Sequence, residues 1–361
     1  MLRAGLIGYP SCGKTTLFQL MTSAHDTARA AHGKSEANVG VSRVPDARLD
    51  RLTALFNPRK RVPAAVEFAD SAAGGRSDAK SLLDVAPFRN ADALVHVLRA
   101  FRDPAVPHPA GSLDPARDAQ SMEDELILAD LGVVEKRLER LARDLKKSAS
   151  PELRKEQEIL LQCRASLEDA RPLRTLGLTG EDAKQLRGFQ FLSAKPQLLA
   201  INLDEADVAT AERAAATHGL ARFLETARAG AVAFCGKIEL EISQLDAADA
   251  AAFLADLGLR ESGLDRVIRA GYDLLGYLSF FTVGEDECRA WSIPRGTPAH
   301  LAAGEIHTDI ARGFIRAEVV TCDALLARGS LAACREHGEL RLEGKDYEVQ
   351  DGDVINFRFA T

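Results

Sequence analysis

The sequence has no long hydrophobic run and no regular spacing of cysteines. No stretch of about 18 apolar residues occurs in the 361 residues, so we expect no membrane-spanning helix. The six cysteines show no C-x-x-C spacing, which argues against a zinc site and a disulfide framework and favours a reducing cytosol. The N-terminus leads directly into a strand and a glycine-rich loop, so we expect no signal peptide and a cytoplasmic protein.

The sequence also has no excess of positive charge. Lys and Arg number 46 against 53 Asp and Glu, which gives a net charge of −7. This balance provides no global basic field, so we expect no DNA partner, and any contact with RNA must come from a local patch. The length predicts two or three domains with a sizeable core.

A glycine-rich loop near the N-terminus separates an apolar strand, residues 2–7, from a predicted helix start. Residues 8–16, GYPSCGKTT, fit the pattern G-x-x-x-x-G-K-[ST], whose backbone N–H groups bind the phosphates of a nucleotide. Lys14 would reach the β- and γ-phosphates, and the Thr15 hydroxyl would hold Mg²⁺. An ordinary glycine-rich turn is the alternative, but the strand and helix on either side favour a phosphate site.

A carboxylate ends the second predicted core strand, residues 64–70. An acidic residue at the carboxyl end of a strand beside such a loop holds Mg²⁺ through water, so we assign Asp70 to the metal and, with Lys14, to catalysis. A third buried strand covers residues 93–99, and His96 within it is interpreted as a packed strand residue rather than a catalytic one.

A candidate base site follows the next strand, residues 196–201. GTPases place N-K-x-D here, and their aspartate binds two N–H groups of guanine. This chain has Asn202, Leu203 and Glu205 at the corresponding positions, which favours adenine, with Asn202 on the base edge and Leu203 against its face. Cys235 and Gly236, at the end of the predicted last strand, return towards the base. A plain strand-to-helix loop is the alternative.

Between the strands at residues 93–99 and 196–201, the apolar residues follow a helical period, at alternating steps of four and three. They predict a coiled-coil seam and, after a break capped by Ser150 with Pro151 at the first helical position, a return helix. The members of the first seam are Ile127, Leu131, Val134, Leu138, Leu141 and Leu145. An antiparallel helical hairpin is therefore expected to be inserted between strands.

The C-terminal third contains short alternating strands at residues 278–283, 289–293, 314–319 and 353–359, with glycines in the turns. A short helical segment is expected near residues 307–313. The fold class is thus α/β, with a mostly parallel sheet, an inserted helical hairpin and a β-grasp domain. The predicted domains are a nucleotide-binding domain (1–120 and 190–277), the hairpin (121–189) and the C-terminal domain (278–361).

Several motifs together resemble the YchF/Obg-like ATPase family of P-loop NTPases. They lie at residues 44–49 (VPDARL), 128–138, 202–205 (NLDE), 289–291, 303–309, 313–318 and 343–347. The resemblance covers nearly the whole chain and implies a G-domain-like fold, a C-terminal TGS domain, ATP in preference to GTP, and association with ribosomes. It also implies that Ser11, Cys12, Gly13, Lys14, Thr15 and Thr16 cradle phosphates and that Leu203 contacts the base.

Three positions depart from the family pattern. Ser11 replaces an asparagine that helps to hold a monovalent cation, which leaves dependence on K⁺ doubtful. In the first switch, Lys34 stands where a threonine is usual, so Ser35 is the nearest hydroxyl for the metal. The second switch, residues 70–75, has its glycine one place late and no hydrophobic residue after it.

We therefore expect a monomeric, slow ATPase that uses ATP and Mg²⁺ as a conformational switch and binds the ribosome, on the large subunit or the 70S particle. The altered switches favour an alternative, an ATP-binding adaptor with little or no hydrolysis. A GTPase and a small-molecule kinase are further alternatives. Candidate contacts with ribosomal RNA are Arg312, Arg316, Arg341, Lys345 and Arg358, although a solvated sheet face explains them equally well.

Overall fold

The computed structural model describes residues 2–23, 38–70, 86–148, 150–178, 180–226 and 228–360. The chain forms two compact units, here called the P-loop unit (Met1–Ser42 with Glu67–Leu274) and the C-terminal unit (Arg43–Val66 with Leu275–Thr361). Within the described ranges, no helix is both long and apolar enough to cross a membrane.

The division differs from the three domains expected from the sequence. The helical hairpin belongs to the P-loop unit, and residues 43–66, expected in the nucleotide-binding domain, fold together with the C-terminal strands. The boundaries of the three domains therefore remain a prediction.

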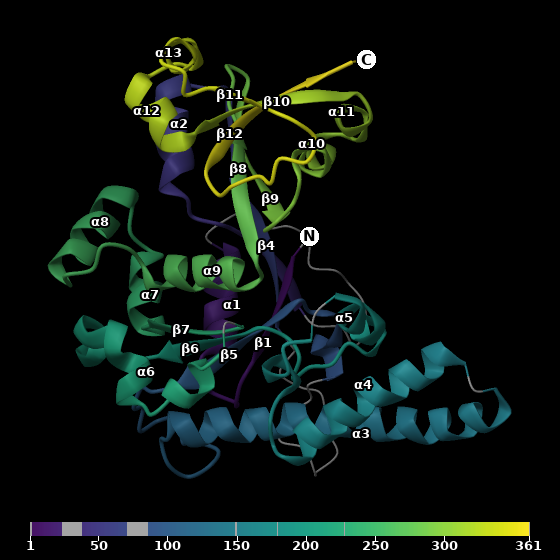
Figure 1. The fold of residues 1–361 in the computed structure, drawn as a ribbon. Coiled ribbons are helices and arrows are strands. Elements are labelled where there is room, and N and C mark those ends of the chain that lie inside the picture. Colours follow the sequence, from purple (N-terminus) through teal and green to yellow (C-terminus); the bar gives the residue numbers. More distant parts are fainter. Residues whose placement is uncertain are drawn as a thin grey trace. The chain divides into compact units, whose positions relative to one another are not determined.

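A six-stranded sheet organises the P-loop unit (Figure 1). Its strand order is β2-β4-β1-β5-β6-β7, and the pairs from β4 to β7 are all parallel. Every residue of β5 and β6 is buried, as expected for parallel strands covered on both faces. The strands are β1 (Arg3–Ile7), β2 (Asn38–Arg43), β4 (Ala65–Asp70), β5 (Ala93–Arg99), β6 (Gln197–Asn202) and β7 (Ala229–Phe234).

Helices cover both faces of this sheet. Figure 1 shows α1 and α9 on one side and α3 and α6 on the other. The helices are α1 (Lys14–Ser23), α3 (Pro115–Lys147), α4 (Pro151–Glu168), α5 (Gly180–Leu186), α6 (Ala214–Thr217), α7 (Gly236–Ile242), α8 (Ala247–Asp256) and α9 (Gly263–Leu274). Short 3₁₀ segments are η1 (Ala86–Asn90), η2 (Leu173–Thr175), η3 (Arg187–Phe189), η4 (Glu205–Arg213) and η5 (Ala221–Leu224).

The predicted hairpin is formed by α3 and α4, which lie side by side in Figure 1. Ser150 caps α4 and Pro151 is its first residue, as predicted. Ile127, Val134, Leu138 and Leu141 pack with apolar residues of α4 in one buried cluster. The helix α3 starts earlier than the seam, at Pro115, because its first turns bury their apolar side chains against the sheet.

The C-terminal unit is a second six-stranded sheet, mixed in direction, with the order β11-β10-β12-β8-β9-β3. Its strands are β3 (Lys60–Val62), β8 (Tyr277–Thr282), β9 (Glu287–Pro294), β10 (Phe314–Thr321), β11 (Arg341–Glu343) and β12 (Asp353–Phe359). Its helices are α2 (Ala47–Phe56), α10 (Ala299–Ile306), α11 (Thr308–Arg312), α12 (Cys322–Arg328) and α13 (Leu331–Glu336). Together the two sheets and the hairpin confirm the predicted fold class.

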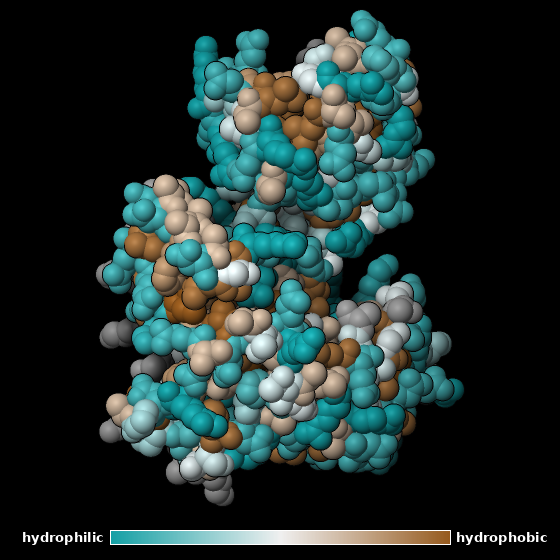
Figure 2. Space-filling view, turned by 90° about the vertical axis from the view of Figure 1, so that its left-hand side faces the viewer, coloured by the Kyte–Doolittle hydropathy of each residue, from teal (hydrophilic) through white to brown (hydrophobic). Residues whose placement is uncertain are grey.

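The alanine-rich helix α8 of the P-loop unit contains no buried residue. Leu240 and Leu245, just before it in the chain, are also exposed, at 42% and 40%. Figure 2 views the face that carries α8 and shows hydrophobic residues gathered there among hydrophilic ones. This apolar surface lies outside the candidate site described next.

Candidate functional site

The loop between β1 and α1 has the backbone conformation that its glycines make possible. Gly8 and Gly13 have φ angles of +144° and +98°, which side chains rarely allow. A Cβ atom at Gly13 would also collide with the amide nitrogen of Asn202. The helix α1 begins at Lys14, so its first N–H groups face the loop and offer positive potential to a phosphate.

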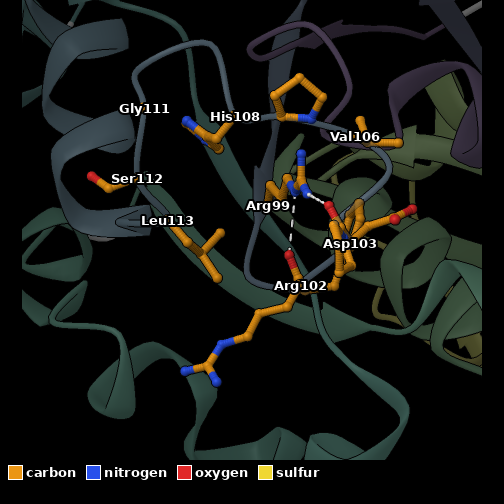
Figure 3. Close-up of a pocket in the computed structure, with 11 residues that line it drawn as sticks. Arg99, Arg102, Asp103, Val106, His108, Gly111, Ser112 and Leu113 are labelled. Atoms are coloured by element: carbon orange, nitrogen blue, oxygen red, sulfur yellow. Dashed lines mark hydrogen bonds between the residues drawn. The ribbon is translucent and has the colours of Figure 1, made fainter.

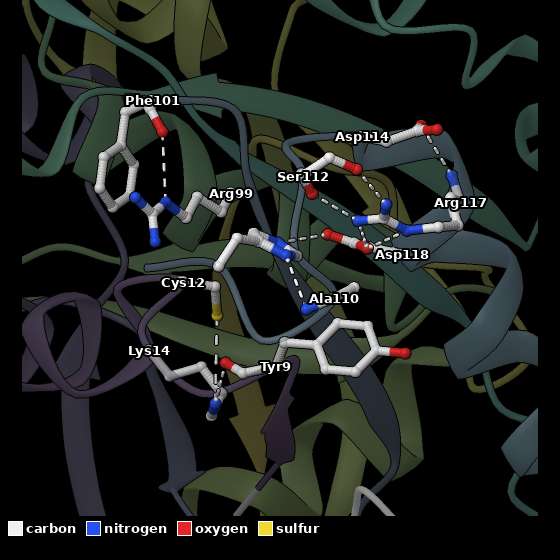
Figure 4. A network of polar contacts seen from close by, with 11 residues as sticks. Tyr9, Cys12, Lys14, Arg99, Phe101, Ala110, Ser112, Asp114, Arg117 and Asp118 are labelled. Carbon is white, nitrogen blue, oxygen red and sulfur yellow. Dashed lines mark hydrogen bonds and ion pairs between the residues drawn. The ribbon is translucent and has the colours of Figure 1, made fainter. Parts of the chain in front are cut away.

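The side chain of Lys14 bonds to the backbone at the start of this loop. Its Nζ donates hydrogen bonds to the carbonyl oxygens of Gly8, at 2.7 Å, and Tyr9, at 2.8 Å. The ammonium group is thereby held over the loop, where charge-assisted bonds to phosphate oxygens are strongest. Figure 4 shows this lysine beside Cys12 and the Tyr9 carbonyl.

Asp70 and Thr15 are brought together from β4 and α1. The Oδ2 atom of Asp70 lies 3.4 Å from the Thr15 hydroxyl. Asp70 is 2% exposed, and its Oδ1 is buried without a hydrogen-bond partner among the described residues. Burial raises the pKa of this carboxyl, and Lys14 and the Thr15 hydroxyl only partly offset the effect.

These oxygens fit a magnesium ion. Mg²⁺ prefers hard oxygen ligands, keeps several waters, and is often held by few protein groups together with phosphate oxygens. A buried carboxylate oxygen without a partner and a neighbouring hydroxyl are donors of that type. Among the described residues, no group of three or more His, Cys, Asp or Glu forms a metal cluster. Ser35, the third predicted ligand, and residues 71–75 lie outside the described residues.

Asn202, at the end of β6, connects two loops of the site. Its Nδ2 donates to the Cys12 carbonyl at 3.1 Å, and its Oδ1 accepts the N–H of Gly236 at 3.0 Å. The side chain is 5% exposed. Both ends of the amide are thus occupied within the protein, whereas the sequence predicted a contact with the base edge. The structure gives Asn202 a positioning role for the P-loop and the start of α7.

The other residues of the predicted base site lie together at the ends of the paired strands β6 and β7, where the N–H of Leu203 donates to the Phe234 carbonyl at 2.8 Å. Leu203 is 2% exposed and packs in the core with residues of β5 and β6. Glu205 forms an ion pair with Lys237 at 2.7 Å. Cys235 is buried as the residue before α7, and burial raises the pKa of its thiol. The predicted contacts of these residues with a base therefore remain predictions.

A histidine that the sequence analysis did not single out lies beside the P-loop. The rings of His108 and Tyr9 are 6.3 Å apart, and the other side of the His108 ring contacts Asp118 of α3. Its Nδ1 accepts the N–H of Ala110, so Nε2 carries the proton and donates to Asp118 at 2.9 Å. The segment is rich in proline and lacks periodicity, so only a lone histidine between two prolines could have drawn attention to it.

Comparisons with known proteins show which family the chain resembles. Residues 277–360 match the family model YchF-GTPase_C, described as a protein of unknown function (DUF933). The chain is 42% identical over 363 residues to the ribosome-binding ATPase YchF of Bacillus subtilis strain 168, and 36% identical over 364 residues to that of Escherichia coli O157:H7. Both alignments cover 99% of each chain.

A solved structure is also similar. The YchF GTPase of Schizosaccharomyces pombe superposes with a TM-score of 0.86 and 28% sequence identity, over 99% of this chain and 97% of that one. The full-length matches to two bacterial relatives, together with this superposition, extend beyond the glycine-rich loop that many nucleotide-binding proteins share. The chain belongs to the YchF family.

Proposed function

We propose that this chain is a ribosome-associated ATPase that hydrolyses ATP slowly and uses the reaction as a conformational switch. The observation that carries the proposal is the placement of Thr15 and the buried Asp70 next to Lys14, at the mouth of the glycine-rich loop. The bacterial relatives named ribosome-binding ATPase match over the full length and supply the ribosome as partner. The family supports a nucleotide as ligand.

Phosphoryl transfer to water depends mainly on positioning and on stabilisation of charge. In this proposal the N–H groups of residues 11–16 and the Lys14 ammonium bind the phosphates. Thr15 and Asp70 hold Mg²⁺, which neutralises phosphate charge when bound. Both ring nitrogens of His108 have protein partners, Nδ1 the N–H of Ala110 and Nε2 the carboxylate of Asp118, so we assign no base for the attacking water. The intrinsic rate is therefore expected to be low.

The surroundings of Glu205 support ATP over GTP. A guanine site needs a free carboxylate to accept two N–H groups, and the carboxylate of Glu205 is paired with Lys237 instead. Competition between ATP and GTP for a fluorescent ATP analogue tests this choice. Tighter binding of GTP would favour the GTPase that the sequence left as an alternative.

The contact with ribosomal RNA is proposed to lie on one face of the C-terminal sheet. Arg316 and Arg358 are directly opposite each other on β10 and β12, and directly opposed side chains point to the same face. Arg358 and Arg335 share one carboxylate, that of the buried Glu318, at 3.0 and 3.3 Å. This face therefore keeps an excess of positive charge that can bind phosphates.

The remaining basic candidates differ in their pairing. Arg341 interacts with Glu343, Asp353 and the Tyr347 hydroxyl, which reduces its value as a phosphate contact. Arg312 lies 3.9 Å from Asp309 in the helix α11, which has no buried residue. The chain is proposed to bind as a monomer, to the large ribosomal subunit or to the 70S particle.

Cosedimentation with ribosomes tests the function. The wild-type chain should pellet with 70S particles, and ATP should change the bound fraction. Lys14→Ala removes the phosphate contact, so its bound fraction should not respond to ATP. Equal binding of both proteins with and without ATP would overturn the switch and leave only the adaptor that the altered switch residues favour.

A further inference from the structure

The helix α8 presents an apolar side to solvent. Eight of its ten residues are apolar, yet none of them is buried. Phe253 holds the inner side of the helix, where it packs partly buried against Val208 and Ile238. Four exposed alanines lie together on the opposite side: Ala248, Ala251, Ala252 and Ala255. A helix of this length gains most of its stability from packing of an apolar face, so this exposure is unusual.

Two leucines beside α8 enlarge its apolar side. Leu240 in α7 and Leu245 in the turn before α8 are 42% and 40% exposed. Figure 2 shows hydrophobic residues gathered on the face that carries α8. We call Leu240, Leu245 and the four alanines the α7–α8 surface. Single exposed leucines are common, whereas apolar residues gathered on one face mark a contact site.

The charges around the α7–α8 surface have one sign. Residues 238–259 contain no Lys, Arg or His, although the whole chain has 46 Lys and Arg. The segment has five acidic residues instead: Glu239, Glu241, Asp246, Asp249 and Asp256. Glu239 is buried and accepts the N–H of Gly263 at 2.7 Å. The other four are exposed, and none of them forms an ion pair within the described part of the chain.

Two of these carboxylates are placed along one edge of α8. Asp249 and Asp256 are seven residues apart, so they lie on the same side of the helix, about 10.5 Å apart along its axis. The exposed Ala252 lies between them, three residues after the first and four before the second. Cationic side chains two turns apart on a partner helix would therefore meet both carboxylates while its apolar side covered the alanines.

The α7–α8 surface is not part of the cavity in the connection from β5 to α3. That cavity, shown in Figure 3, belongs to the candidate site, because the N–H of its lining residue Arg102 donates to Asp204 of the predicted base segment. None of the residues that line it belongs to the α7–α8 surface. Leu240 lies one turn after Gly236, whose N–H bonds to Asn202, so the surface adjoins the candidate site without using its residues.

We propose that the α7–α8 surface docks a basic, amphipathic helix of another protein. The apolar side of that helix packs against Leu240, Leu245 and the alanines, and its Lys and Arg side chains lie beside the carboxylates. Charge selects this occupant. A second copy of the chain would bring acidic edges together, and juxtaposed like charges oppose association. Nucleic acids and anionic membranes are negatively charged and would be repelled in the same way.

The probe is a fluorescent peptide of leucine and lysine, about five helical turns long, with all its leucines on one side. Anisotropy with the full chain, without nucleotide, measures its affinity, so failure of the proposed ATPase function leaves this test unaffected. Two control peptides replace lysine by glutamate or keep the composition and distribute the leucines around the helix. The probe should bind at least about tenfold more tightly than either control, and its affinity should fall as salt rises.

Paired substitutions locate the binding. Leu240→Ser with Leu245→Ser should weaken the probe by about tenfold, because two apolar contacts are lost. Asp249→Asn with Asp256→Asn should weaken it by about fivefold. The matched controls lie on the hairpin and should leave the affinity unchanged. They are Leu128→Ser with Leu161→Ser, at leucines 62% and 40% exposed, and Glu135→Gln with Glu139→Gln, at two exposed glutamates of α3.

Amide hydrogen exchange provides a readout without substitutions. The amides of α8 should exchange rapidly in the free chain, since none of its residues is buried, and the bound probe should slow their exchange. No measurable binding of the probe, equal binding of the control peptides, unchanged affinity in both paired variants, or protection outside α7 and α8 would overturn the proposal. Self-association that Leu240→Ser with Leu245→Ser abolishes would identify a second copy as the occupant and also overturn it.

Discussion

The Nδ2 atom of Asn202 donates a hydrogen bond to the carbonyl of Cys12, 190 residues earlier in the chain, at 3.1 Å. The carbonyl oxygen of the same side chain accepts the N–H of Gly236. One buried amide thus fixes the phosphate loop relative to the strand-to-helix turn before α7, and the geometry of the loop depends on it.

Asn202→Ala should weaken binding of ATP by about tenfold, because two buried backbone groups lose their partners and the loop loses its support. The free energy of unfolding should fall by about 1–3 kcal/mol. Fluorescence titration with an ATP analogue and urea unfolding measure the two effects. Gln120→Ala, which removes an exposed amide bonded to Asp124, should change neither. Unchanged affinity for ATP in Asn202→Ala would contradict the positioning role.

Asp70→Asn should lower the activity and raise the stability of the chain. Burial raises the pKa of Asp70 above its ordinary value of 3.8, so the folded state holds this proton more tightly than the unfolded state. The contribution of Asp70 to stability therefore falls as the pH rises from the unfolded-state pKa of 3.8 through the higher pKa of the folded state. At pH 7 the ionised carboxylate costs stability, and the amide removes that cost.

The Tm of Asp70→Asn should accordingly exceed that of the wild-type chain at pH 7 in the absence of Mg²⁺, and the difference should vanish below pH 3.8. Magnesium-dependent turnover should fall by about 10²-fold or more, because the metal loses a carboxylate. Thermal unfolding at several pH values and phosphate release at several Mg²⁺ concentrations provide the readouts. A variant that turns over normally would remove Asp70 from the metal site.

Arg48→Lys should destabilise the C-terminal unit by about 1–3 kcal/mol. Arg48 binds Asp351 at 2.8 Å, bonds to Asp46, and lies 5.3 Å from the centre of the Phe281 ring. Lysine lacks the planar fork needed for all three contacts. Arg51→Lys on the same helix is the matched control, because its pair with Asp323 is exposed and 3.5 Å long, and it should cost less than about 0.5 kcal/mol. Equal effects of the two variants in urea unfolding would contradict this account.

Glu318→Gln should increase the affinity for ribosomes while lowering stability. Burial by itself would raise the pKa of Glu318, but the bonds from Arg358 and Asn356 and the charge of Arg335 together lower it. A carboxyl with a lowered pKa stabilises the fold above its unfolded pKa, and this contribution is lost as the pH falls through the folded pKa. The free energy of unfolding of the variant should therefore be lower than that of the wild-type chain by about 1 kcal/mol at pH 7, and this difference should disappear at acid pH.

Removal of this negative charge leaves Arg316, Arg335 and Arg358 more available to RNA phosphates. Binding to ribosomes should tighten severalfold at low salt, and the gain should shrink at high salt. Glu343→Gln, which removes one carboxylate partner of Arg341 in the edge strand β11 and leaves Asp353 and Tyr347 in place, is the control and should have a smaller effect. Weaker binding by Glu318→Gln would place the RNA contact on another surface.

Local patterns predicted most elements of the fold. The strand, glycine loop and helix at residues 2–21 each have a local signature, as does the Ser150 cap of α4. The packing of α2 and β3 with the C-terminal strands was not predicted. It depends on contacts such as that between Arg48 and Asp351, 303 residues apart, which no local period reveals.

The candidate site was predictable to a similar extent. Lys14, Thr15 and Asp70 occupy positions fixed by a motif and by strand ends, and the structure brings them together. The bonding of Asn202 could not be derived, because an amide at a strand end suits a base and a backbone carbonyl equally well. His108 lies in a segment without periodicity, so only the fold places it beside Tyr9.

The most direct test of the central claim is phosphate release from ATP and from GTP by the purified chain, with and without ribosomes, with Lys14→Ala as the blank. The account predicts slow release from ATP above the blank, less release from GTP, and an increase with ribosomes. Measurable binding of ATP with no release above the blank, even with ribosomes, would contradict it and identify a nucleotide-binding adaptor instead.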